Sequence, residues 1–215
     1  MTRLTPCWLL LGGLLAAEDL PQGDREIVDW IASAYQVEVV LGDVRFPVQE
    51  PSYNIVGADA PAESISRYLP VLKRELSKYP PDLPSKVHVS KIVLAVGLGV
   101  DSQLRGGVPH FRLGWLFLDT ERGRHAKGYQ ERVFHHEFFH LVDYADDGEV
   151  YQDAEWAKLN PAEFHYESGG AQMQDSREDP CRETDEIPGF LTLYGTAGVE
   201  EAFATPARNQ PARWR

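Results

Sequence analysis

The chain has 215 residues, of which 43% are apolar and 25% are charged, and its net charge is −12. This length and composition are typical of one globular domain with a substantial core. A nucleic-acid partner requires clustered Lys and Arg side chains against the phosphates, and the sequence lacks such a cluster before its last eight residues. We therefore expect no nucleic-acid partner.

The first 17 residues have the layout of a secretory signal peptide. Arg3 is followed by the apolar run Cys7–Ala17 and then by two acidic residues. Eleven apolar residues are too few to span a bilayer as a helix. The alternative is a short buried or membrane-retained helix. We expect a signal peptide at 1–17, a mature domain at 24–215, a secreted or periplasmic location, and no stable membrane insertion after signal removal.

The amino-terminal part predicts one helix and one strand. A capping Asp24 and apolar residues at fourfold spacing predict an amphipathic helix over 24–35. The β-branched run 37–41 predicts a strand. Residues 49–60, rich in Pro, Gly and Asn, are expected to form a loop.

The middle of the chain predicts a helix and two strands. Apolar residues at helical spacing predict a helix over 61–79, kinked or divided at Pro70. The run 87–100 is nearly continuous in β-branched residues and predicts a central strand. A second strand is expected over 113–119, after a turn at 105–107. These elements suit a small sheet with helices on one side.

The most informative stretch is an H-E-x-x-H sequence within a helix expected over 126–145. His136 and His140 lie one turn apart, so their imidazoles can converge on one ion while Glu137 sits beside it. This arrangement predicts a Zn²⁺ site. The opposite stripe of the helix is apolar and is expected to face the core; it consists of Phe134, Phe138 and Leu141.

The remaining histidines have no partner at metal-ligand spacing. His135 points about 100° away from its neighbour on the helix, so we expect it to support the site or to pack. We expect surface or loop positions for the other four, which are His88, His110, His125 and His165.

A catalytic zinc ion usually takes three protein ligands, so the two histidines need a third partner. The sequence after His140 lacks the third histidine of an H-E-x-x-H-x-x-G-x-x-H pattern. Asp143 is short and lies on the same helix, so we expect it to orient a histidine or another nearby group. Cys181, in a charged loop, is more typical of a free thiol. The candidates that stay open are Asp143, His165, Cys181, Glu200 and Glu201.

Four segments resemble one enzyme family. They are HHEFFHLVDY at 135–144, Gly189-Phe190, Tyr194, and Glu201-x-x-Ala204. They are similar to the gluzincin metallopeptidases, especially the zinc-binding metallopeptidases of secreted bacterial proteins and the lethal-factor-like catalytic domains. The resemblance is best from about residue 87 to residue 204. It implies an α+β, zincin-like single domain, with a small twisted mixed sheet packed on the H-E-x-x-H helix and a second ligand-bearing helix near the C-terminus.

The same resemblance implies roles for individual residues. His136, His140 and Glu201 would bind Zn²⁺, and Glu137 would be the general base that activates water against a peptide or protein substrate. Tyr194 would donate to the oxyanion, although a packed loop aromatic is an equally good interpretation. The strand over 113–119 would be the edge strand that pairs with substrate.

Two segments depart from a simple zincin pattern. Residues 146–190 form a long loop-rich insertion, which is expected to be a wall or lid of the site. Thr205 stands where the family has a second glutamate, and Pro206 follows it, so the ligand helix is expected to be shorter than two turns and 206–215 to form an irregular tail. The alternative function is therefore a catalytically impaired zinc-binding or partner-binding module. A zinc amidase would use the same residues.

Overall fold

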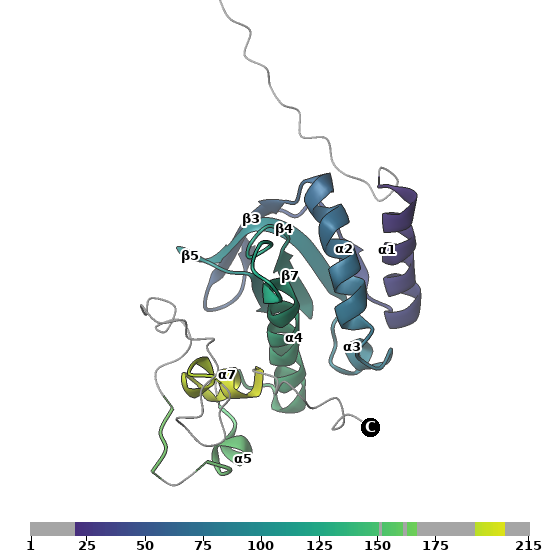
Figure 1. Cartoon of the computed structure of the whole chain (residues 1–215). Helices are drawn as coiled ribbons and strands as arrows, with labels where there is room; N and C mark the ends of the chain where they lie inside the picture. The colour runs from purple at the N-terminus through teal and green to yellow at the C-terminus, as the bar shows by residue number, and fades with distance from the viewer. Residues whose placement is uncertain (1–19, 151, 161–162, 167–191, 205–215) are drawn as a thin grey trace, which may run out of the picture.

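The structure, a computed structural model, describes residues 20–150, 152–160, 163–166 and 192–204. These residues form a seven-stranded mixed sheet with helices packed against it (Figure 1), so the α+β class is confirmed. The expected signal peptide at 1–17, Cys181, the 189–190 pair and the tail at 206–215 lie outside the described residues. No helix in the described part of the chain is long and apolar enough to cross a membrane.

The elements follow one another along the chain in this order: α1 (Gln22–Tyr35), β1 (Glu38–Val40), β2 (Val48–Gln49), β3 (Asn54–Asp59), α2 (Ala62–Leu76), α3 (Leu83–Lys86), β4 (Lys91–Val100), β5 (Gln103–Leu104), β6 (Gly107–His110), β7 (Trp115–Asp119), α4 (Tyr129–Asp147), α5 (Ala154–Ala157), the 3₁₀ helix η2 (Tyr194–Thr196) and α7 (Val199–Ala204).

The longest strand, β4, is the centre of the sheet. On one side it pairs in parallel with β7, and on the other it pairs in parallel with β1 and antiparallel with β3. The main strand order is β2-β3-β4-β7-β6. The predicted edge position of 113–119 is therefore wrong, because β7 lies between β4 and β6. On this side the sheet ends at β6, a short segment of four buried residues that includes Gly107 and Pro109, two residue types with low strand propensity.

The two faces of the sheet have separate hydrophobic layers. Ile92 and Leu94 of β4 join the cluster formed by α1, α2 and α4, as expected for helices on one side. Val93 and Ala95 alternate to the opposite face, where residues of the segment 44–53 cover them. The sheet is thus buried on both faces, which explains why β4 is almost continuously apolar.

Strand β3 corrects the loop predicted over 49–60. It pairs antiparallel with β4, with a register shift between Val56 and Ala58. Ile55 is completely buried in the second hydrophobic layer. Tertiary pairing with β4 outweighs the weak intrinsic strand propensity of its Asn, Gly and Ala residues.

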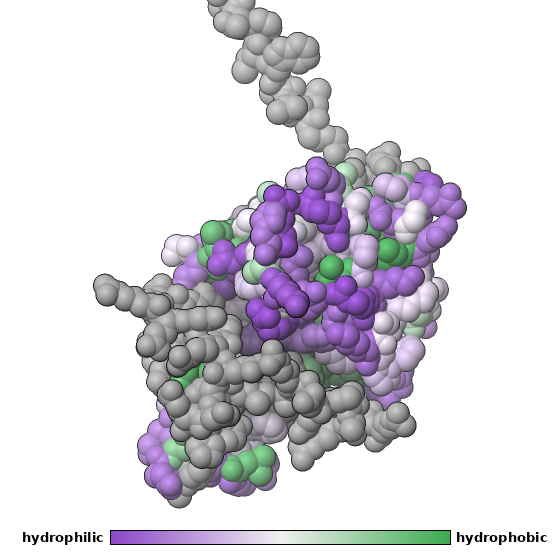
Figure 2. All heavy atoms as spheres, viewed as in Figure 1, coloured by the Kyte–Doolittle hydropathy of each residue, from purple (hydrophilic) through white to green (hydrophobic). Residues whose placement is uncertain are grey.

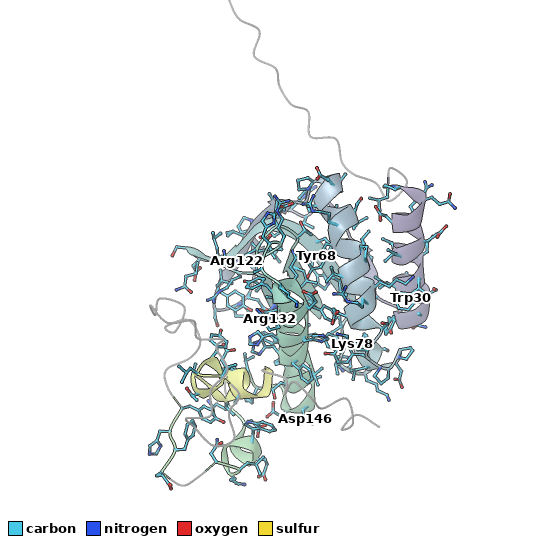
Figure 3. The ribbon with its side chains drawn as sticks, in the orientation of Figure 1. Trp30, Tyr68, Lys78, Arg122, Arg132 and Asp146 are labelled. Atoms are coloured by element: carbon cyan, nitrogen blue, oxygen red, sulfur yellow. The ribbon has the colours of Figure 1, made fainter. Side chains whose placement is uncertain are left out.

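Helices α1 and α2 lie side by side on the sheet (Figure 1). Their outer surface is predominantly hydrophilic (Figure 2), as their amphipathic sequences require. Tyr68 of α2 is 1% exposed and lies where α2 meets the sheet and α4 (Figure 3). Pro70 lies inside α2 and leaves it a single element. Asp24 is not the N-cap of α1, which is Pro21; its carboxylate instead accepts a hydrogen bond from Ser66 of α2.

Helix α4 crosses the helical face of the sheet and carries the H-E-x-x-H sequence. Its predicted apolar stripe is confirmed, because Phe134, Phe138 and Leu141 are each at most 2% exposed. The helix ends at Gly148, whose φ of 80° places it in the left-handed region and whose N–H donates to Tyr144 O at 2.9 Å. The packing of this stripe fixes the rotation of α4 and therefore the direction of the opposite face.

A polar contact also holds α4 against α2. Glu75 of α2 is 1% exposed and accepts hydrogen bonds from His135 Nε2 at 2.8 Å and from Arg74 Nε at 2.7 Å, as well as from Lys78. The other ring nitrogen of His135 is 2.6 Å from Tyr79 Oη. His135 is thus a packing residue, as predicted, and it anchors the helix one residue before the first metal-ligand candidate.

Candidate metal centre

The two histidines of the H-E-x-x-H sequence meet on the side of α4 that faces away from the core. Their Nε2 atoms are 3.1 Å apart, and their ring centroids are 4.6 Å apart. The side chains are only 20% and 11% exposed for His136 and His140, respectively. The helical spacing therefore brings two nitrogen donors together at a partly shielded position.

Glu201 approaches the same point from a second helix. Helix α7 crosses close to α4 (Figure 1), and Glu201 Oε2 lies 3.1 Å from His136 Nε2 and 3.9 Å from His140 Nε2. The ligand atoms of all three residues lie within 4.8 Å of one another. The glutamate predicted from the family resemblance is the one that completes this cluster.

The donor set and its spacing fit a zinc ion. A tetrahedral site with metal–ligand distances of about 2.0–2.2 Å places neighbouring ligand atoms about 3.3 Å apart. The distances between the three donor atoms here are 3.1, 3.1 and 3.9 Å. Two imidazoles and one carboxylate are also a ligand combination used in catalytic zinc sites, with one position left for water or substrate.

The electrostatics of the cluster favour metal-binding protonation states. Burial, followed by the charge of His136, lowers the pKa of His140 to about 3, although Glu201 opposes this shift. Burial by itself would raise the pKa of Glu201, but hydrogen bonding and the charges of the two histidines lower it below its ordinary value. At neutral pH, His140 is therefore a neutral imidazole and Glu201 a carboxylate, the forms that bind a cation.

Tyr194 contacts the same glutamate from the 3₁₀ helix η2. Its hydroxyl donates to Glu201 Oε1 at 2.9 Å, and its ring centroid lies 5.7 Å from that of His136. Tyr194 is thus adjacent to the cluster and orients the carboxylate. The role of Tyr194 at an oxyanion stays a prediction.

Glu137 lies on the side of α4 that faces β6. A Cβ atom on Gly107 would come within 2.6 Å of Glu137 Cγ, so the glycine permits this close approach of strand and helix. Burial raises the pKa of Glu137 to about 7; the charge of His136 lowers it and that of Glu201 raises it. Sequence reasoning missed Gly107, which it assigned to a turn.

Three other ligand candidates in the described part of the chain do not join the cluster: Asp143, His165 and Glu200. His165 is exposed. The buried carboxylate of Glu200 lies against Gly198. Burial, together with neighbouring carboxylates such as Asp153, raises the pKa of Asp143 to about 7. The orienting role of Asp143 stays a prediction.

One of the remaining histidines also differs from its predicted environment. His110 is 3% exposed, and its Nδ1 lies 2.7 Å from Glu50 Oε1, whose side chain is also buried. This pair joins the end of β6 to the segment after β2. The other three predicted surface histidines are exposed, as expected: His88, His125 and His165.

The comparisons with known proteins add no assignment to this geometry. The chain matches no known protein-family model, no curated protein and no solved structure.

Proposed function

We propose that this protein is a zinc-dependent metallopeptidase of the gluzincin type. The observation that carries the proposal is the meeting of Glu201 Oε2 with the Nε2 atoms of His136 and His140, from two separate helices. The adjacent Glu137 gives this cluster the four groups that the H-E-x-x-H chemistry requires. A zincin-like fold is part of the same proposal.

His136, His140 and Glu201 would hold the zinc ion. When bound, zinc would supply Lewis acidity, which polarises a substrate carbonyl and makes a water molecule more acidic. The single anionic ligand, Glu201, would leave the site with a net positive charge. Tyr194 would keep that carboxylate oriented through its hydrogen bond to Oε1.

Glu137 would move the protons. It would take a proton from the attacking water and deliver it to the amine that leaves when the peptide C–N bond breaks. Burial raises the pKa of Glu137, which opposes the lowering effect of a bound cation and favours a group that both accepts and releases a proton. Gly107 would keep β6 close beside Glu137.

Strand β6, in place of β7, would align the substrate. The Asp119 N–H of β7 donates to Gly106 O at 2.8 Å. In an antiparallel pair, consecutive residues direct their N–H and C=O groups alternately towards and away from the partner strand, so those of Gly107 point away from β7. The backbone of Pro109, two residues later, also faces away from β7. It has no N–H to offer, and its carbonyl accepts a hydrogen bond from Tyr53 Oη at 3.1 Å. Main-chain recognition of an extended peptide would therefore depend mainly on Gly107.

A catalytically impaired zinc-binding module is the second candidate function. The described part of α7 is Val199–Ala204, and the sequence Thr205-Pro206 that follows it would end the glutamate-bearing helix early. Zinc binding without turnover would support this candidate. Export of the protein, proposed from residues 1–17, is common to both functions.

A peptidase assay with a zinc-loaded protein tests the proposal. Wild type is expected to cleave unstructured peptides, to lose this activity with a chelator, and to recover it when zinc is restored. Glu137→Gln should bind zinc but lose about 10²–10⁴-fold in rate. The exposed Glu149→Gln is the matched control and should retain full activity. Full activity in Glu137→Gln would contradict the role of the base.

A further inference from the structure

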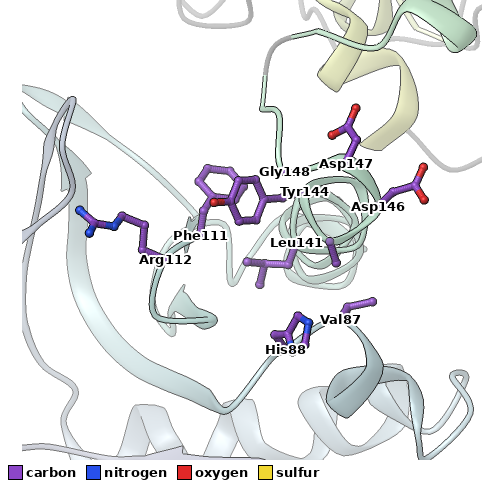
Figure 4. A pocket seen from close by; sticks show the side chains of 10 residues that line it. Val87, His88, Phe111, Arg112, Leu141, Tyr144, Asp146, Asp147 and Gly148 are labelled. Carbon is purple, nitrogen blue, oxygen red and sulfur yellow. The ribbon is translucent and has the colours of Figure 1, made fainter.

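A cavity of about 340 Å³ opens at the C-terminal end of α4, beyond the metal cluster. Leu141 and Tyr144 project into it from α4, and Phe111 faces them from the chain directly after β6 (Figure 4). The rings of Phe111 and Tyr144 have centroids 5.1 Å apart and planes tilted by 50°. Val87 and His88 form the opposite wall.

This cavity continues the side of α4 on which Glu137 lies. Tyr144 follows Glu137 at position i+7 on the same stripe of the helix, and Leu141, at i+4, lies at the border between this stripe and the buried apolar stripe. At a rise of 1.5 Å per residue they lie about 6–10 Å along the axis from Glu137. An extended peptide covers about 3.3 Å per residue, so this distance corresponds to two or three substrate residues.

The direction of β6 decides on which side of the cleaved bond these residues lie. Gly107 contacts Glu137, while Phe111 contacts Tyr144, so β6 runs in the same direction as α4. A peptide paired antiparallel with β6, the more stable arrangement, would have its amino-terminal part next to Phe111. The cavity would then accept a side chain before the cleaved bond.

The walls determine the chemistry of that side chain. The surfaces of Val87, Phe111, Leu141 and Tyr144 are apolar or aromatic. The charged groups at the rim, among them Arg112 and Asp147, point away from the enclosed space (Figure 4). A volume of about 340 Å³ is near the lower limit of small-ligand sites, which suits one large side chain.

We propose that this cavity is a specificity subsite that accepts a large aliphatic or aromatic side chain, two or three residues before the cleaved bond. The inference rests on the proposed peptidase function. It also supplies recognition that the β6 backbone lacks, because Pro109 removes one main-chain donor. The substrate side chain that occupies this subsite therefore largely determines which peptides are cleaved.

The cleavage-site profile of the zinc-loaded protein tests this proposal, with a mixed library of unstructured peptides and mass spectrometry of the products. Wild type is expected to prefer Phe, Tyr, Leu or Ile over Ala by about tenfold at the second or third residue before the cut. Tyr144→Ala, which opens the cavity, and Ala145→Trp, which fills it, should both flatten that preference.

Trp30→Ala is the control, since it removes an aromatic ring of α1 that lies under Lys73 of α2 and does not line the cavity. This variant should keep the wild-type profile. Thermal melts would establish that each variant is folded. Cleavage with no preference at these two positions, or a preference that survives in both cavity variants, would overturn the subsite.

A binding measurement separates failure of the subsite from failure of the proposed function. Zinc-loaded Glu137→Gln would be titrated against two fluorescein-labelled pools of ten-residue peptides, one containing Phe and Leu and the other Ala in their place. Adding Ala145→Trp should weaken binding of the Phe/Leu pool by about tenfold and leave the Ala pool unchanged. If wild type cleaves no peptide, the peptidase proposal fails, and this binding difference decides the subsite.

Discussion

The hydroxyl of Tyr194 donates a hydrogen bond to Glu201 Oε1 at 2.9 Å, while the other carboxylate oxygen of Glu201 lies 3.1 Å from His136 Nε2. Tyr194 therefore fixes which oxygen faces the two imidazoles. It belongs to the segment just before α7, so the ligand and its orienting group come from adjacent parts of the chain. This hydrogen bond fixes the orientation of the Glu201 carboxylate.

Tyr194→Phe should weaken zinc binding by about 10–100-fold, because removing the hydroxyl leaves the Glu201 carboxylate free to rotate. Competition with a chromogenic chelator would measure the zinc affinity. Tyr144→Phe loses the same atom on α4 beyond the cluster and should keep wild-type affinity. An unchanged affinity in Tyr194→Phe, with a reduced rate of cleavage, would instead favour an oxyanion role.

Gly107→Ala should reduce peptide cleavage by about 10²-fold while zinc content stays at the wild-type level. The added Cβ would lie 2.6 Å from Glu137 Cγ and would displace the base. Initial rates at saturating zinc, together with metal analysis, would measure both quantities. Gly23→Ala, where a Cβ has open space in α1, is the control and should behave as wild type. Normal cleavage by Gly107→Ala would show that this contact does not position Glu137.

Glu75→Gln should lower the free energy of unfolding by about 2 kcal/mol, because the buried carboxylate accepts charge-assisted hydrogen bonds from three side chains. Urea denaturation monitored by circular dichroism would measure this change. The control is Glu63→Gln, whose side chain is 88% exposed and pairs with Arg67. It should cost less than about 1 kcal/mol. Equal effects of the two substitutions would contradict the anchoring role of Glu75.

The same carboxylate predicts a dependence of stability on pH. Burial by itself would raise the pKa of Glu75, but hydrogen bonds from Lys78, Arg74 and His135 lower it from 4.5 to about 2. A depressed folded-state pKa contributes stability above pH 4.5, and this contribution is lost as the pH falls towards 2. The stability difference between wild type and Glu75→Gln should therefore shrink over this interval. A constant difference in urea titrations from pH 5 to pH 2 would contradict the shift.

Local sequence signals predicted the elements that carry strong periodicity. The apolar stripe of α4 and the β-branched run of β4 determine their own structure, because each buries a face that the sequence identifies. The spacing of His136 and His140 likewise fixes the distance between two donors on one helix. These features need no information from the rest of the chain.

Long-range pairing decided the features that the sequence did not reveal. Strands β3 and β6 contain Asn, Gly and Pro, and they form because β4 and β7 offer partners. His110 is buried because Glu50 pairs with it across 60 positions of the chain. Glu200 and Glu201 are adjacent in sequence, and only the packing of α7 on α4 directs the second of them to the histidines.

The metal content of two adjacent glutamate variants tests whether Glu201 is the third zinc ligand. Wild type, Glu200→Ala and Glu201→Ala would be loaded with zinc, passed through a desalting column and measured by inductively coupled plasma mass spectrometry. We expect one zinc ion per chain in wild type and in Glu200→Ala, and a large loss in Glu201→Ala. Full zinc retention by folded Glu201→Ala would contradict the assignment of Glu201 as the third ligand.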